Sequence, residues 1–78
     1  VLFRSAIHEG IDFFTACAEG VMCPLGSGAI DYPAIKDFLA RRGYQGWITI
    51  EQERDPRHAA GSLQAVTESL RYLRDVGF

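Results

Sequence analysis

Hydrophobic residues recur at helical spacing in three separate stretches of the chain. The first covers residues 6–18, and its apolar positions are Ile7, Ile11, Phe14 and Ala18. Gly10 interrupts this stretch, and a glycine inside a helix costs about 1 kcal/mol relative to alanine. The pattern still predicts one helix, which ends at Gly20 because glycine readily takes the left-handed conformation that follows a helix.

The second stretch has clear signals at both ends. Asp31 can accept hydrogen bonds from free N–H groups of a first helical turn, and Pro33 is tolerated there because its missing donor is not needed. Gly43 supplies the stop. The sequence therefore predicts a helix between these residues, with a buried face formed by Ile35, Phe38 and Leu39.

The third stretch runs from Ser62 to about Val76, and Gly77 ends it. Its apolar residues fall on one side of a helix, and we expect that side to be buried. They are Leu63, Val66, Leu70, Leu73 and Val76.

Residues 47–50, with the sequence Trp-Ile-Thr-Ile, predict a strand. Their β-branched and aromatic side chains are typical of a strand that is buried on both faces, as in a parallel sheet. Residues 21–28 favour a loop or an edge segment, since Pro24 cannot donate a ladder hydrogen bond. A parallel strand requires neighbours that this order of elements does not provide. We therefore expect an α/β fold of which this chain is a fragment, in the order helix, loop, helix, strand, helix.

Size and charge exclude several classes of protein. With 78 residues, the chain is short enough that an independent core is marginal. The formal charge of -2 provides no basic surface for nucleic acid, and no apolar run approaches the roughly 20 residues that a membrane helix needs. We therefore expect neither nucleic acid nor membrane as a partner, and a cytoplasmic location in the absence of a secretory pattern.

The cysteines do not indicate a redox or metal site. Cys17 and Cys23 are separated by five residues, which is not a CxxC spacing, and the two histidines stand at no ligand spacing to them. We expect both cysteines to be buried free thiols.

The first five residues require separate treatment. Residues 2–5, Leu-Phe-Arg-Ser, match the translated end of a common sequencing adapter. We therefore expect residues 1–5 to be an assembly scar and residues 6–78 to belong to a single domain.

Glu51 is the strongest candidate for chemistry, because it directly follows the predicted strand. In a (β/α) barrel, reactive residues come from the carboxyl ends of strands. A carboxylate there can bind a divalent metal or act as a base, but a solvated loop glutamate fits the spacing as well. Gly26-Ser27-Gly28 is a weaker candidate: it lacks the third glycine of a dinucleotide motif and suits a turn close to a ligand.

Residues 23–56, CPLGSGAIDYPAIKDFLARRGYQGWITIEQERDP, carry a resemblance to a known family. The blocks PLGSG, IDYPAI, RRGYQGW and ITIEQ resemble the C-terminal part of inosose dehydratases and related sugar phosphate isomerases/epimerases of the xylose isomerase-like barrel type. The final helix is similar to the closing helix of that family. Glu53 differs from the family, where aspartate is more common.

The resemblance implies a fold and an activity. The fold would be a (β/α)8 TIM barrel, of which this chain is the C-terminal fragment, with Mn²⁺ or Co²⁺ held by carboxylates and a histidine. Glu51 would be a metal ligand and an acid/base group, and Gly26, Ser27 and Gly28 would lie beside the substrate. The full-length enzyme would be a lyase of inositol catabolism that removes water from 2-keto-myo-inositol.

Two other functions remain open. One is a sugar or hydroxypyruvate isomerase or epimerase on the same barrel, which would keep Glu51. The other is a small non-catalytic helical interaction module, which would need a core of its own. If the chain is a fragment, the remaining metal ligands lie outside it, and we expect it to be inactive alone.

Overall fold

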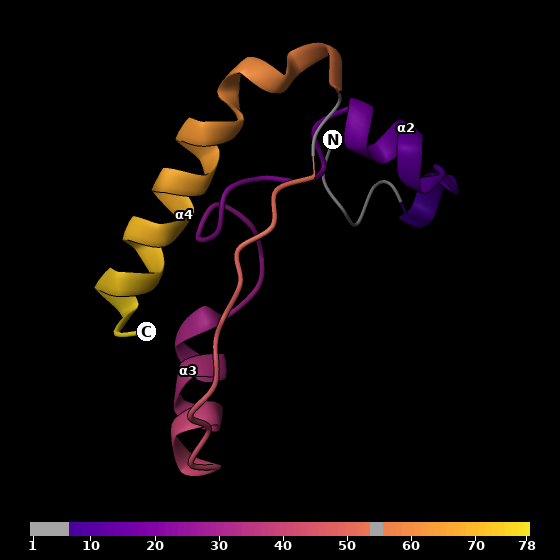
Figure 1. Cartoon of the computed structure of the whole chain (residues 1–78). Coiled ribbons are helices and arrows are strands. Elements are labelled where there is room, and N and C mark those ends of the chain that lie inside the picture. The colour runs from indigo at the N-terminus through magenta and orange to yellow at the C-terminus, as the bar shows by residue number, and fades with distance from the viewer. Residues whose placement is uncertain (1–6, 54–55) are drawn as a thin grey trace.

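The computed structural model describes residues 7–53 and 56–78, and four helical elements are resolved in these ranges (Figure 1). They are α2 (Phe13–Ala18), α3 (Tyr32–Arg41), the 3-10 helix η1 (Pro56–Gly61) and α4 (Ser62–Val76). Residues 19–31 and 42–53 form long non-helical segments. The proposed scar at residues 1–5 lies outside the described residues.

The first predicted helix is wrong as a single element. Residues 7–9 are helical, but the chain then breaks, and α2 begins only at Phe13. Gly10 has a φ of +67°, which is incompatible with a right-handed helix. Asp12 then caps a new helix, because its carboxylate accepts a hydrogen bond from the backbone N–H of Thr15 at 3.0 Å.

The second and third predicted helices are confirmed. Asp31 Oδ1 accepts a hydrogen bond from the backbone N–H of Ala34 at 3.0 Å, and α3 ends just before Gly43. At the end of α4, Phe78 N–H donates to the carbonyl of Leu73 at 2.9 Å, which closes the helix after Gly77. Local hydrogen bonds thus mark both ends of α3 and the C-terminal end of α4, whereas α4 begins after Gly61 without a side-chain cap.

The face of α4 that packs differs in part from the expected one, because Leu73 is buried as predicted but the other two leucines are not. Leu63 is 79% exposed and Leu70 is also exposed, while the buried positions are Ala65, Ser69 and Leu73. These three residues are four apart, so they form a continuous stripe on one side of the helix. The small side chains of the first two let another segment approach α4 closely.

The predicted strand does not form within the described ranges. Residues 47–50 are assigned to no regular element, and Trp47 is 94% exposed. The expectation of burial on both faces is therefore wrong for this chain. A strand needs a neighbouring segment to complete its ladder of hydrogen bonds, and no described segment provides one. The backbone of Trp47 instead has a local hydrogen-bond partner: the hydroxyl of Tyr44 donates to the carbonyl of Trp47 at 2.7 Å.

The cysteines also depart from expectation. Neither forms a disulfide, but Cys23 is exposed and Cys17 is only half-buried. The prediction of free thiols is confirmed, and the prediction that both are buried is wrong. Burial of a thiol needs segments that cover it, and the described residues bury only four side chains.

Few side chains are buried in this arrangement. The core consists of Ala16, Ala65 and Leu73, together with the polar Ser69. The solvent-accessible surface is 6273 Å², whereas a folded monomer of this mass has about 4700 Å². The helices therefore leave most of their apolar faces open.

Candidate functional site

A tight turn lies at the centre of the candidate site. The backbone N–H of Ser27 donates to the carbonyl of Pro24 at 3.1 Å, and Gly26 has a φ of +92°. A positive φ at the third position is what a type II turn requires, and glycine adopts it without strain. We call residues 24–28 the glycine turn.

Helix α4 contacts the glycine turn through Ser69 and Tyr72. The backbone N–H of Leu25 donates to Oγ of Ser69 at 3.0 Å, and Ser69 is only 1% exposed. Gly26 lies so close to Tyr72 that a Cβ atom at this position would be 2.5 Å from the ring carbon Cδ2. The turn is thus fixed by one polar and one steric contact with the same helix.

Tyr72 also connects α4 to the start of α3. Its ring meets the ring of Tyr32 edge to face, with centroids 5.9 Å apart and an interplanar angle of 78°. Burial raises the pKa of Tyr32 above its usual value of 10.0, and the charges of Cys23 and Tyr72 raise it further. The phenol of Tyr32 therefore stays neutral over the physiological range.

Glu51 lies on the wall of a cavity of about 360 Å³ beside the glycine turn. We call this space the Glu51 cavity. It is formed by two segments that are far apart in the sequence, residues 21–32 and residues 51–53. Its lining residues are Val21, Met22, Cys23, Pro24, Leu25, Gly26, Gly28, Ala29, Ile30, Tyr32, Glu51, Gln52 and Glu53.

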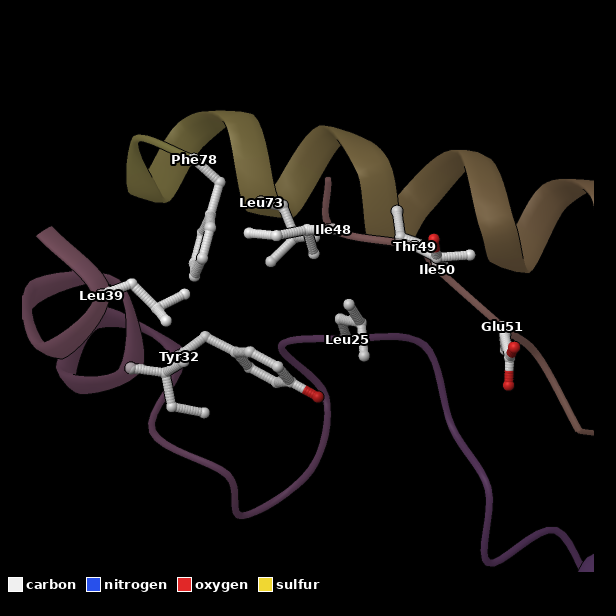
Figure 2. Close-up of a pocket in the computed structure, with 10 residues that line it drawn as sticks. Leu25, Tyr32, Leu39, Ile48, Thr49, Ile50, Glu51, Leu73 and Phe78 are labelled. Carbon is white, nitrogen blue, oxygen red and sulfur yellow. The ribbon is translucent and has the colours of Figure 1, made fainter. Parts of the chain in front are cut away.

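A second cavity of about 370 Å³ lies between α3, α4 and residues 48–51 (Figure 2). Its lining is mostly apolar and includes Leu39, Ile48, Leu73 and Phe78. Figure 2 shows Glu51 at one end of this space, apart from the apolar side chains. Glu51 lines both cavities.

The carboxylate of Glu51 is exposed and makes no hydrogen bond or ion pair with a described residue. It is therefore available for a ligand. Within residues 7–53 and 56–78, no three His, Cys, Asp or Glu side chains lie close enough together to hold a metal ion. The Glu51 cavity thus has the carboxylates of Glu51 and Glu53 on its wall, and these residues do not make a complete metal centre.

Three of the four predicted site residues line one cavity. Gly26 and Gly28 line the same cavity as Glu51, whereas Ser27 does not. Sequence reasoning missed Ser69, Tyr72 and Tyr32, which hold the turn. A serine four residues from Ala65 on an otherwise leucine-rich helix was the available signal for Ser69, because a small polar residue there suits a close backbone approach.

A comparison with known protein families shows which family residues 7–76 match. These residues match the family described as xylose isomerase-like TIM barrel. The chain belongs to this family. Membership confirms the resemblance seen in the sequence and indicates an α/β fold. The described residues of the chain contain helices and loops but no strand.

The relatives of this xylose isomerase-like chain include a rhizopine catabolism protein and several inosose dehydratases. The chain is 38% identical over 58 residues to the rhizopine catabolism protein MocC of Rhizobium meliloti, a match that covers 74% of the chain and 18% of that protein. It is 40% identical over 66 residues to inosose dehydratase of Bacillus licheniformis, covering 85% of the chain and 22% of the relative. It is 33% identical over 69 residues to inosose dehydratase of Mesomycoplasma hyopneumoniae, covering 87% and 23%.

The chain thus spans about a fifth of the length of these relatives. No solved structure matches it. In the described part of the chain, no helix is both long enough and apolar enough to cross a membrane.

Proposed function

We propose that this chain is part of an inosose dehydratase-like lyase, which removes water from 2-keto-myo-inositol. The observation that carries this proposal is the position of Glu51, a carboxylate free of described partners on a cavity that it shares with the glycine turn. The inosose dehydratases among the relatives support the same substrate class.

The proposal also assigns the chain to a place in the barrel, as its C-terminal strand–helix unit with the helix and loop before it. Exposed apolar side chains on Trp47 and Ile48 support this assignment, because the adjacent strands of a complete barrel would cover them. Residues 47–50 would become a strand only when those neighbours pair with it.

A divalent metal, Mn²⁺ or Co²⁺, belongs to the proposal. An exposed carboxylate is a suitable oxygen ligand for such an ion, so Glu51 fits as one ligand. The described residues do not supply the others, which we assign to the rest of the barrel. When bound, the ion would polarise the ketone of the substrate.

In this proposal, Glu51 transfers a proton during the dehydration. Dehydration removes a proton from the carbon beside the ketone, while the hydroxyl of the next carbon leaves as water with one added proton. Because the carbon that loses its proton also carries a hydroxyl group, the resulting enol rearranges to a second ketone. A carboxylate on the wall of the Glu51 cavity can accept the first proton or deliver the second.

Replacement of Glu51 by glutamine in the full-length enzyme tests this assignment. Glu51→Gln keeps the size of the side chain but removes its charge and its basicity. We expect turnover of 2-keto-myo-inositol to fall by roughly 10²–10⁴-fold, and bound metal per subunit to decrease. Steady-state kinetics and elemental analysis measure both quantities.

Two matched variants control the experiment. Glu53→Gln changes a second carboxylate on the wall of the same cavity, so it tests whether the effect belongs to Glu51 alone, and it should cost far less. Glu68→Gln changes an exposed carboxylate of α4 that accepts a hydrogen bond from Gln64 at 3.0 Å, and it should cost nothing measurable. Normal turnover and metal content in a folded Glu51→Gln enzyme would show that Glu51 is an ordinary loop carboxylate. Activity on a sugar in place of the ketone would favour an isomerase.

A further inference from the structure

We propose that Ser69 is a positioning residue that holds the glycine turn on the wall of the Glu51 cavity. This inference rests on the function proposed above, since it gives that cavity a substrate. The contact that carries the inference joins residues 44 positions apart: Oγ of Ser69 accepts a hydrogen bond from the backbone N–H of Leu25 at 3.0 Å. Ser69 is also the one side chain among the described residues that is almost completely buried, with 1% of its surface exposed.

The hydroxyl of Ser69 satisfies a backbone donor that the turn itself leaves unpaired. The hydrogen bond that closes the turn uses Pro24 and Ser27, so Leu25 has to find its acceptor elsewhere. Buried backbone donors are almost always paired, and a serine of α4 provides the acceptor. Loss of the hydroxyl would leave this N–H group without an acceptor from α4.

Of the two residues that flank Ser69 on this side of α4, Tyr72 contacts the turn and Ala65 is small. On one side, Ala65 is 3% exposed, and its small side chain leaves space for a neighbouring segment. On the other side, Gly26 is in contact with the ring of Tyr72, which the ring of Tyr32 supports from α3. The turn therefore lies against one part of α4, where the hydrogen bond to Ser69 holds it.

The position of the turn determines the shape of the cavity. Leu25 lines both the Glu51 cavity and the apolar cavity, so it lies at the boundary between them. Gly26 and Gly28 line the Glu51 cavity on the side of the turn. A displaced turn would therefore change the substrate space without altering the carboxylate of Glu51.

The test compares Ser69→Ala with Thr67→Ala in the full-length enzyme. Thr67 is an exposed residue of the same helix whose hydroxyl donates to the carbonyl of Leu63 at 2.8 Å, so its loss leaves the turn unaffected. We expect Ser69→Ala to raise KM for 2-keto-myo-inositol roughly tenfold with a smaller change in kcat, because it disturbs binding more than proton transfer. Thr67→Ala should leave both constants unchanged. Circular dichroism checks that each variant folds, and Ser69→Cys replaces Ser69→Ala if the latter does not.

Amide hydrogen exchange at Leu25 provides a readout that needs no substrate. We expect it to be about tenfold faster in Ser69→Ala than in the wild type or in Thr67→Ala. Unchanged exchange at Leu25, or faster exchange with an unchanged KM, would overturn the inference. If the wild-type enzyme does not convert the ketone, the proposed function fails, and the exchange rates alone then decide whether Ser69 holds the turn.

Discussion

Asp12 begins α2 with a carboxylate that accepts two hydrogen bonds from one residue. Oδ1 accepts from the backbone N–H of Thr15 at 3.0 Å, and Oδ2 accepts from its hydroxyl at 2.8 Å. Both bonds are stronger to the ionised carboxylate than to the neutral acid, so they lower the pKa of Asp12 below its ordinary value of 3.8, the backbone bond most strongly. The start of α2 is therefore coupled to pH.

The sign of this coupling gives a prediction. A carboxyl group with a lowered pKa in the folded state stabilises that state above its unfolded pKa, and the contribution is lost as pH falls through the folded value. We expect the N-terminal turn of α2 to loosen below pH 3.8, seen as movement of the Thr15 amide resonance in an NMR titration of the full-length protein. Asp12→Asn keeps an uncharged cap, so its Thr15 resonance should not respond to acid in this range. An equal response in both proteins would contradict the prediction.

Helix α3 is well specified at its ends and poorly covered along its side. Phe38 is 47% exposed and Ile35 is also exposed, so the predicted buried face remains open within this chain. The guanidinium carbon of Arg42 lies over the ring of Phe38, 5.1 Å from the ring centroid. Capping defines this helix, and packing against other segments must supply most of its stability.

The cap of α3 can be tested directly. Asp31→Ala removes the acceptor of the Ala34 N–H group, and we expect the free energy of unfolding of the full-length enzyme to fall by about 1 kcal/mol. Asp37→Ala is the matched control, because Asp37 lies on the same helix and makes only an exposed contact of 3.9 Å with Lys36. Chemical denaturation measures both values. Equal losses from the two variants would mean that the cap of Asp31 adds nothing.

The molecule as a whole is extended for its length. Its radius of gyration is 14.2 Å, whereas a compact domain of 78 residues has about 11.5 Å. Helix α3 meets α4 near the C-terminus, while α2 lies far from both, as Figure 1 shows. With only four buried side chains described, the chain has little apolar burial to offset the entropy lost on folding.

We therefore expect the isolated 78-residue chain not to unfold in a sharp two-state transition. Thermal unfolding followed by circular dichroism should show a broad, weakly cooperative change, and calorimetry with Mn²⁺ should show no tight binding. A cooperative transition with dispersed amide resonances at low concentration would contradict this expectation. That outcome would favour the self-contained helical module.

The sequence by itself determined the ends of α3 and α4, because Asp31, Gly43 and Gly77 act through hydrogen bonds within a few residues of themselves. It also identified Glu51 and the glycines of the turn as candidates, and the family blocks identified the relationship. Only the tertiary structure decided that Glu51 meets this turn at one cavity. The packing face of α4 could not be read from its leucines, since Ser69 is buried by a contact with a backbone 44 residues away. The strand at residues 47–50 failed for the same reason: its hydrogen-bond partners are non-local, and propensity alone does not supply them.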